Sequence, residues 1–205
     1  MSAGATLVAA SRELYQRGWL PGTAGNISVR VSPETALITA SGRDKGALTE
    51  SDTVLVSVDT SAAVSPDAPR PSAETTIHTA IYRATKAEAV VHTHSPYATA
   101  VATLEGHRSQ LSTVDIQGFE LLKGLGLRDP SATTVPVFPN HADVPRIAAE
   151  VERYLIEHPD APPVVLIEHH GLTTWGADYA QARNRMECVE SICQLLLLLK
   201  GRAFS

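Results

Sequence analysis

The stretch Ala89-Val90-Val91-His92-Thr93-His94-Ser95-Pro96 joins a short apolar strand to the start of a helix. Residues i and i+2 of a strand project from the same face, so His92 and His94 can reach one cation. Zinc accepts such ligands, and a catalytic zinc site typically has three protein ligands and one open position. Two histidines also occur by chance on half-buried strands, so the pair needs a third ligand before it indicates a metal site.

A third ligand is available in Ile167-Glu168-His169-His170-Gly171, which ends another apolar strand. Adjacent strand residues face opposite sides, so we expect only one of His169 and His170 to reach the metal. The spacing does not say which. A structural or solvated role is expected for the other histidines, which are His78, His107, His141 and His158. Of these His78 is the least secure, because it follows Glu74 by four residues on a predicted helix.

Hydrophobic periodicity predicts a mixture of strands and helices along the whole chain. The predicted strands are 27–31, 36–40, 53–58, 89–94, 134–138 and 164–168, and the predicted helices are 7–19, 75–85, 118–124, 143–157 and 178–200, with one more beginning at Ser95-Pro96. Short turns at Ser32-Pro33 and Ser41-Gly42 join the first strands, which only antiparallel pairs permit. We therefore expect an α/β fold with a mainly antiparallel central sheet flanked by helices.

Length and charge restrict the class of protein. The chain has 205 residues, which at about 150 residues per domain favours a single domain over residues 1–205. Its 17 Lys and Arg against 22 Asp and Glu give a net charge of −5, which argues against binding nucleic-acid phosphates. A small anion remains possible, because it requires only a local positive site.

The apolar runs and the cysteines bear on location. The longest apolar stretch, Leu195 to Leu199, is far shorter than the about 20 residues that span a bilayer, and no basic segment precedes an apolar run at the N-terminus. Cys188 and Cys193 are five apart on a predicted helix and so are poorly placed to form a disulfide. We expect free thiols and a soluble, cytoplasmic protein without a membrane partner.

Two turns contain the groups that a phosphate site needs. Gly25-Asn26 and the segment 39–46 (Thr-Ala-Ser-Gly-Arg-Asp-Lys-Gly) offer backbone N–H groups, hydroxyls and a cation, so the candidates are Asn26, Ser41, Gly42 and Lys45. Ser72, the predicted N-cap of the next helix, could add a hydroxyl and helix N-terminal amides. Most such turns bind nothing, so these signals are weak alone.

Two carboxylates are candidates for acid–base chemistry. Glu74 lies in the first turn of a predicted helix, where it also interacts favourably with the helix dipole. Glu120 begins the segment Glu120-Leu121-Leu122-Lys123-Gly124 and could equally be an exposed helix residue. Either could be a general acid–base if it faces a metal-bound ligand. Local sequence does not decide this.

Five motifs occur in a specific order and spacing: Gly25-Asn26-Ile27-Ser28, Thr39-Ala40-Ser41-Gly42, Pro71-Ser72-Ala73-Glu74, His92-Thr93-His94-Ser95 and His170-Gly171. Together they resemble the class II aldolase/adducin family across nearly the whole chain. The resemblance implies a class II aldolase-like fold and one Zn²⁺ per subunit, held by His92, His94 and His170. It thereby selects His170 over His169. It also implies a small phosphorylated ketose as substrate and a homotetramer with sites near subunit interfaces.

Within the family, the likeness is greatest to dehydratases that act on a methylthio-substituted ketose phosphate in methionine salvage. It is carried by Gly18-Trp19-Leu20-Pro21-Gly22-Thr23, Ser41-Gly42-Arg43-Asp44-Lys45-Gly46, Pro71-Ser72-Ala73-Glu74-Thr75, Phe119-Glu120-Leu121-Leu122-Lys123-Gly124 and Gly171-Leu172-Thr173-Thr174-Trp175-Gly176. The acid–base glutamate of the dehydratases matches Glu120, and the catalytic carboxylate of the aldolases matches Glu74. We favour Glu120 for loss of water. Arg43 stands where many dehydratases have Lys, which keeps the charge but changes the hydrogen-bond geometry.

Two other functions are compatible with the sequence. A sugar-phosphate aldolase or epimerase of the fuculose or ribulose phosphate type would use the same metal ligands. A non-catalytic binding module resembling the adducin head would keep the fold without the metal. The three histidines count against the binding module, because a scaffold has no evident need for them. They do not separate the dehydratase from the aldolase.

Overall fold

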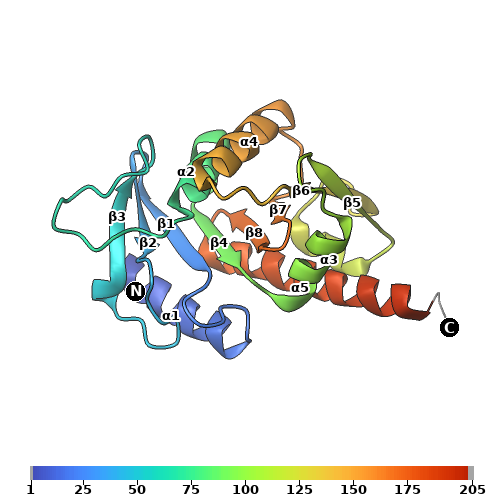
Figure 1. Cartoon of the computed structure of the whole chain (residues 1–205), viewed down its shortest axis with the longest axis horizontal. Helices are drawn as coiled ribbons and strands as arrows, with labels where there is room; N and C mark the ends of the chain where they lie inside the picture. Colours follow the sequence, from blue (N-terminus) through green and yellow to red (C-terminus); the bar gives the residue numbers. More distant parts are fainter. Residues whose placement is uncertain (1, 203–205) are drawn as a thin grey trace.

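The computed structural model describes residues 2–202, and its strands form one sheet. The strands are β1 (Asn26–Ser32), β2 (Thr35–Thr39), β3 (Thr53–Ser57), β4 (Ala89–Thr93), β5 (Ser112–Gln117), β6 (Ala132–Phe138), β7 (Val164–Ile167) and β8 (Gly171–Gly176). Across this described part of the chain the sheet has eight strands in the order β3-β2-β1-β4-β8-β7-β6-β5 (Figure 1). Strands β4 and β8 therefore lie side by side at its centre, and all of their residues are buried.

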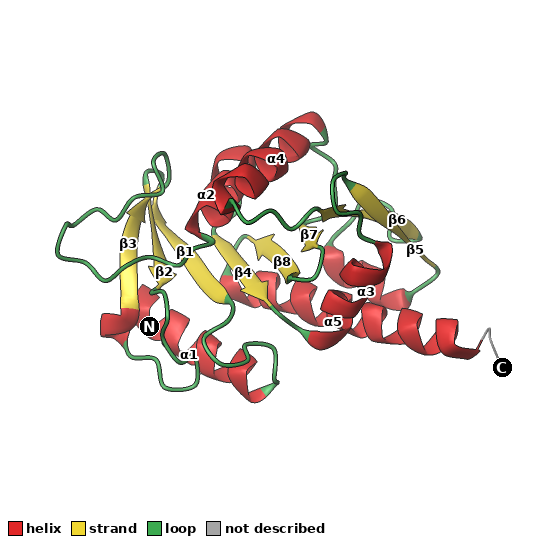
Figure 2. Ribbon diagram, viewed as in Figure 1, coloured by secondary structure: helices red, strands yellow, loops and turns green. Residues whose placement is uncertain are grey.

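The helices cover both faces of the sheet. They are α1 (Ala3–Gln16), α2 (Thr75–Ala84), α3 (Pro96–Glu105), α4 (Val144–Glu157) and α5 (Tyr179–Arg202), with 3₁₀ turns η1 (Glu50–Asp52) and η2 (Glu120–Leu125). Helices α2 and α4 lie on one face, and α1, α3 and α5 lie on the other (Figure 2). The result is a helix–sheet–helix arrangement.

Alternation along β4 divides the core into two clusters. Val91 packs into the cluster on the α1, α3 and α5 side, whereas Val90 packs into the cluster on the α2 and α4 side. Successive side chains of a strand point to opposite faces, so His92 is directed toward the α2 side and Thr93 toward α5. Thr93 indeed hydrogen-bonds the sulfur of Met186 on α5. The apolar residues of β4 thus set the side of the sheet on which its histidines lie.

The predicted fold class is confirmed. Among the described residues, β6 and β7 form the one parallel pair, and the other six neighbouring pairs are antiparallel. The predicted helices and strands match observed elements within a few residues, except that 118–124 forms the 3₁₀ turn η2 rather than an α-helix. Only six residues separate Phe119 from the left-handed Gly126, which is too short for a stable α-helix.

Two strands were not predicted. In β5 the buried Val114 and Ile116 alternate with exposed residues, so the signal was present in the sequence but weak. Strand β8 carries Leu172-Thr173-Thr174-Trp175 between two glycines, and it does not alternate because both of its faces are buried. Its pairing with β4 and β7 identifies it.

The prediction that Ser72 is the N-cap of the next helix is wrong. The N-cap of α2 is Glu74, two residues later. Ser72 instead begins a turn in which its carbonyl accepts hydrogen bonds from the N–H and the hydroxyl of Thr75. Pro71 makes an isolated bridge to Ala40, which holds the chain extended before this turn. Helix α2 therefore starts two residues later than the prediction based on Ser72.

The cysteines of α5 and the composition of the helices bear on two of the sequence-based expectations. Cys188 and Cys193 are free, buried thiols, as predicted. Within residues 2–202, none of the helices combines the length and the apolar composition needed to cross a membrane.

Gly171 brings β8 against the end of β4 at unusually short range. A Cβ built on Gly171 would lie 2.1 Å from the Thr93 carbonyl oxygen and 3.2 Å from the Cα of His94. Both contacts are with main chain, which cannot rotate away as a side chain can. Only glycine lets the turn before β8 approach the end of β4 this closely.

We predict that Gly171→Ala destabilises the protein by about 3 kcal/mol or more, because the two strands must separate locally. The matched control is Gly22→Ala, since a Cβ at Gly22 meets no atom within 4 Å, and the only strain there comes from its positive φ (60°), which Gly171 does not have. The control should cost only about 1 kcal/mol. Urea unfolding of the three proteins measures both effects, and equal losses in the two variants would show that the close approach is unimportant.

Candidate metal centre

Three histidines meet at one end of the sheet. His92 is the fourth residue of β4, His94 follows the strand just before α3, and His170 lies in the turn that precedes β8. The register pairs Thr93 with Leu172, so the turn before β8 lies beside the end of β4. One ring nitrogen from each histidine falls within 4.8 Å of the others. The structure thus brings together the three histidines that the resemblance selected.

His169 is directed elsewhere. Its backbone has a positive φ of 53°, and its side chain is 53% exposed. The imidazole lies 3.4 Å from the carboxylate of Glu168 rather than at the triad. The His170 N–H donates to the Ile167 carbonyl and closes a turn in which His169 takes the left-handed conformation, so the two histidines face different directions.

Hydrogen bonds fix which nitrogen of two histidines faces the cluster. The Nδ1 of His92 lies 2.9 Å from the hydroxyl of Thr173, its cross-strand neighbour on β8. The Nδ1 of His170 lies 3.3 Å from the Oδ1 of Asn140. In both rings Nε2 therefore faces the cluster, which is the arrangement expected when a second hydrogen bond orients a metal ligand.

The spacing and the charge state of the imidazoles fit zinc. The Nε2 atoms of His92 and His94 are 3.3 Å apart. Two nitrogens at zinc-bond length in a tetrahedral arrangement are separated by about 3.3 Å. Burial and the neighbouring charge of His170 lower the pKa of His94 to about 4 and hold the pKa of His92 well below its ordinary value. Both rings are therefore neutral at pH 7, the form that coordinates a metal.

A carboxylate completes the polar cluster. Glu74, at the start of α2, places Oε1 3.5 Å from Nε2 of His170, and its Oε2 accepts hydrogen bonds from the Asn26 amide and, at 3.0 Å, from the Ser72 hydroxyl. Burial alone raises the pKa of Glu74, but hydrogen bonding with His170, the positive charge that His92 and His170 carry when protonated, and the Ser72 hydroxyl together hold the pKa well below its usual range. Glu74 is thus an ionised carboxylate beside the triad, able to accept a proton or to contact a cation.

The predicted phosphate-binding residues also gather beside the triad. One recess of about 280 Å³ is lined by all five of them, namely Asn26, Ser41, Gly42, Lys45 and Ser72, together with Glu74 and His94. They come from β1, from the turn after β2 and from the segment before α2. Residues distant in sequence therefore line one recess.

Lys45 is the cation of this recess. Its side chain is 2% exposed, and its Nζ donates to the carbonyl oxygens of Thr23 and Arg43, at 3.0 Å each. Burial lowers the pKa of Lys45, and the carboxylates of Glu74 and Asp44 offset part of that effect. An ammonium group has three donors, so one remains for a ligand. An anion in the recess would supply the acceptor and the negative charge.

Glu120 lies outside this recess. It begins η2, its side chain is 82% exposed, and its carboxylate pairs with Lys123 at 2.6 Å. The other end of η2 packs on the first half of α5, where Asn184 and Arg185 donate to the carbonyls of Gly124 and Leu125. Within the described part of one chain, no hydrogen bond or ion pair joins Glu120 to the triad.

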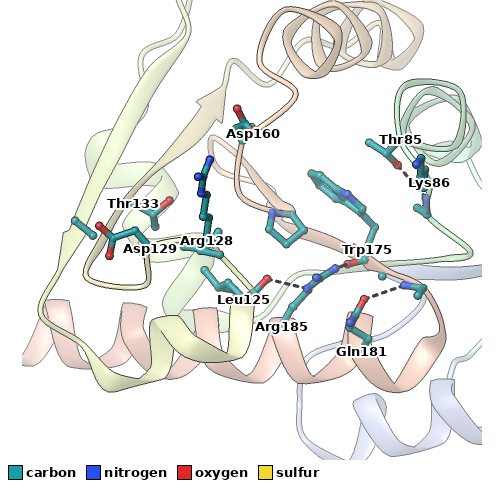
Figure 3. Close-up of a pocket in the computed structure, with 18 residues that line it drawn as sticks. Thr85, Lys86, Leu125, Arg128, Asp129, Thr133, Asp160, Trp175, Gln181 and Arg185 are labelled. Atoms are coloured by element: carbon teal, nitrogen blue, oxygen red, sulfur yellow. Dashed lines mark hydrogen bonds between the residues drawn. The ribbon is translucent and has the colours of Figure 1, made fainter.

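A hollow of about 700 Å³ lies at the opposite end of the central strands, between the start of β4, the end of β8 and η2 (Figure 3). Exposed Lys86 and Arg128 lie on its rim. Arg185 lies in its wall and donates to the carbonyls of Leu125 and Trp175, so it ties α5 to η2 and β8. None of the predicted site residues lines this hollow.

Sequence reasoning missed the residues that support the triad. Thr173 and Asn140 hydrogen-bond two of its histidines, and the buried Glu190 of α5 contacts the segment after His94. Thr173 could have been found if β8 had been recognised as the partner of β4. No local pattern marks Asn140 or Glu190, because their contacts depend on how distant segments pack.

Comparison with known proteins supports a family assignment. The family described as Class II Aldolase and Adducin N-terminal domain matches residues 5–197. A probable bifunctional methylthioribose-1-phosphate isomerase/methylthioribulose-1-phosphate dehydratase of Nocardia farcinica is 56% identical over 95% of this chain, which spans 35% of that relative's length. The methylthioribulose-1-phosphate dehydratase of Methylococcus capsulatus is 41% identical over 96% of this chain and 94% of its own. The solved L-fuculose-1-phosphate aldolase of Thermus thermophilus has a TM-score of 0.75 at 26% identity, over 98% of this chain and 95% of its own.

A buried histidine beneath Glu74 gives a prediction about acid stability. His78 on α2 is 1% exposed, its Nδ1 lies 2.7 Å from the Ser28 hydroxyl, and that hydroxyl also contacts Tyr82. Burial lowers the pKa of His78 to about 4, and Glu74 offsets only part of the effect. As the pH falls, His78 is protonated near pH 6.5 in the unfolded chain but only near pH 4 in the folded chain. The folded state therefore loses stability as the pH falls toward 4.

We predict that wild-type protein loses about 2 kcal/mol more than His78→Asn between pH 7 and pH 5, since asparagine has no proton to bind. Urea unfolding of both proteins in the presence of a chelator measures this difference without a contribution from metal. Parallel losses in the two proteins would contradict a neutral, buried His78.

Proposed function

We propose, since the chain belongs to the class II aldolase and adducin family, that it is a zinc-dependent lyase that dehydrates 5-methylthioribulose 1-phosphate. The product would be 2,3-diketo-5-methylthiopentyl 1-phosphate, a step of methionine salvage. The observation that carries the proposal is the convergence of His92, His94 and His170 beside a recess lined by Lys45. The dehydratase names of the relatives supply the substrate.

The triad and the recess would bind different parts of the substrate. When bound, Zn²⁺ would act as a Lewis acid on the ketone and the neighbouring hydroxyl oxygen of the substrate. Lys45, Ser41 and Ser72, with Asn26 and the backbone at Gly42, would hold the phosphate in the adjoining recess. A substrate fixed at both points presents its third and fourth carbons to the acid–base groups.

Two carboxylates are proposed for the proton transfers. Glu74 is ionised and touches His170, so it is placed to take the proton from the third carbon. Glu120, in its protonated form, would donate to the hydroxyl that leaves the fourth carbon as water. Ketonisation of the resulting enol then gives the diketone. The hydrogen lost from the third carbon and the hydroxyl lost from the fourth carbon together equal the one water released.

A second candidate function is favoured by one observation. Within one chain it is Glu74, the carboxylate that matches the aldolases, that lies at the triad, whereas Glu120 does not. A sugar-phosphate aldolase or epimerase would need Glu74 but not Glu120. The two functions are separated by their products, because an aldolase would cleave the bond between the third and fourth carbons.

We also propose that the protein is a homotetramer with its sites near subunit interfaces. Exposed apolar side chains support a covered surface, since Leu104, Leu198 and Leu199 are each more than half exposed on α3 and α5. Glu120 is exposed on η2 and would reach a triad only in another copy. The free thiols of Cys188 and Cys193 support a reducing compartment such as the cytoplasm.

The central prediction concerns zinc and turnover. Zinc-loaded protein incubated with 5-methylthioribulose 1-phosphate should release one water and form the diketone, followed by mass spectrometry. His92→Ala should lose roughly 100-fold or more in zinc affinity, and turnover with it. Glu120→Gln should keep its zinc while losing roughly 100- to 10,000-fold in rate, as expected for a missing general acid.

His107→Ala is the control, because His107 is an exposed turn residue and its loss should change neither zinc content nor rate. Formation of dihydroxyacetone phosphate, or no turnover at full zinc occupancy, would overturn the dehydratase and favour the aldolase or epimerase.

The position of Glu120 predicts complementation between inactive variants. Co-refolding His92→Ala with Glu120→Gln should restore about a quarter of the sites, because random assembly pairs an intact triad with an intact neighbouring Glu120 in that fraction. Turnover of the mixture against each variant alone measures it. A mixture as inactive as its components would place Glu120 in the site of its own chain or outside any site.

A further inference from the structure

Glu190, in the middle of α5, carries a carboxylate with no evident role in the proposed chemistry. It is 4% exposed, although α5 is otherwise one of the outer helices. The ion pairs that α5 makes in the described chain use Arg183, Glu187 and Lys200 and leave Glu190 out. A buried carboxylate without a cation is costly unless several hydrogen bonds replace its water.

Those hydrogen bonds all come from the residues that follow His94. Glu190 accepts from the Ser95 hydroxyl at 2.7 Å, from the Tyr97 N–H at 3.0 Å and from the Ala98 N–H at 2.8 Å. These residues form the N-terminus of α3, where Ser95 is the N-cap and Pro96 occupies the first turn. Three donors on one carboxylate clamp this helix start firmly to α5.

The clamp replaces an ordinary helix cap. Ser95 makes no cap hydrogen bond of its own, because its hydroxyl donates to Glu190 instead. The two N–H groups that an N-cap side chain would normally satisfy are bonded by Glu190. The negative carboxylate also lies at the positive end of the helix dipole. The start of α3 is therefore fixed by a residue on a different helix.

The position of the His94 ring depends on this helix start, whereas side-chain hydrogen bonds orient the rings of the other two histidines. In the described chain the rings of His92 and His170 are oriented through Nδ1 by Thr173 and Asn140, whereas Nδ1 of His94 has no such partner. The backbone N–H of His94 donates to the Trp19 carbonyl at 3.0 Å, and Ser95 follows directly. The position of the ring is thus set by the main chain on either side.

We propose that Glu190 is a positioning residue for the metal centre, which holds His94 in register with His92 and His170 by clamping the start of α3. The proposal rests on the metal site of the proposed function. It assigns to α5, which contributes no ligand, control over the geometry of the triad. Loss of the clamp should therefore weaken metal binding beyond any general loss of stability.

The first test is Glu190→Gln, which keeps the size of the side chain but turns donors toward the N–H groups of α3. Zinc affinity of the metal-free protein, measured by competition with a chromophoric chelator, should fall 10- to 100-fold. The visible absorption spectrum of the Co²⁺-substituted protein should change, because it reports coordination geometry. Urea unfolding of the metal-free protein gives the accompanying loss of stability.

The matched control is Leu155→Ala, a buried residue of α4 on the opposite face of the sheet (Figure 1). It should lose comparable stability while keeping the zinc affinity and the Co²⁺ spectrum of the wild type. Ser95→Ala removes one of the three donors and should lower zinc affinity several-fold, and it decides the matter if Glu190→Gln does not fold.

If Glu190→Gln keeps the zinc affinity and the Co²⁺ spectrum of the wild type, the positioning role is overturned while the metal site stands. If Glu190→Gln does not fold, the same result in Ser95→Ala overturns that role. An affinity loss in Leu155→Ala as large as that in Glu190→Gln would also overturn it, because stability alone would then explain the effect. Wild-type protein that binds no zinc, or that keeps its zinc in His92→Ala, would overturn the proposed metal site itself.

Discussion

The pairing of β4 with β8 is the interaction on which the candidate site depends. It places the turn that carries His170 beside the end of β4, from which His92 and His94 project. The approach is close enough that only glycine fits at position 171. The helices on both faces bury this strand pair completely, so its main-chain positions are held by the two hydrophobic clusters. The triad is thus built at the end of the fully buried central strands.

The polar groups around the triad are arranged for ligands rather than for stability. Two neutral imidazoles, an ionised carboxylate and a buried ammonium group share one recess and its border. In the described chain the side-chain oxygen Oδ1 of Asn26 and the Nε2 of His78 are buried without a hydrogen-bond partner. Such groups cost free energy in the folded chain. A cation at the triad would engage the imidazole nitrogens, and an anion in the recess would accept from the remaining donor of Lys45, so ligands would offset part of the cost of this polar cluster.

The arrangement also shows why one family can support different reactions. In the proposed function the triad and the recess would bind features that many ketose phosphates share, so they would not choose the bond that breaks. That choice would fall to the carboxylates. Glu74 contacts the triad of its own chain, whereas Glu120 is exposed and pairs with Lys123. The proposed acid–base group could therefore be changed, or supplied by another copy, without disturbing the triad.

Sequence alone determined the fold class and much of the site. Short turns required antiparallel strands, the strand alternation placed His92 and His94 on one face, and turn chemistry marked most of the residues that line the recess. These features are local, since each depends on neighbours within a few residues. The choice of His170 over His169 came instead from the family resemblance, which rests on motifs along nearly the whole chain.

Tertiary structure decided the rest. That β8 is a strand, that α2 begins at Glu74 rather than Ser72, that Thr173 and Asn140 orient two of the histidines, and that Glu190 caps a helix other than its own all follow from contacts between distant segments. A strand buried on both faces has no alternation to reveal it, and a buried carboxylate gives no local sign of its partner. Such contacts exist only once the chain has packed.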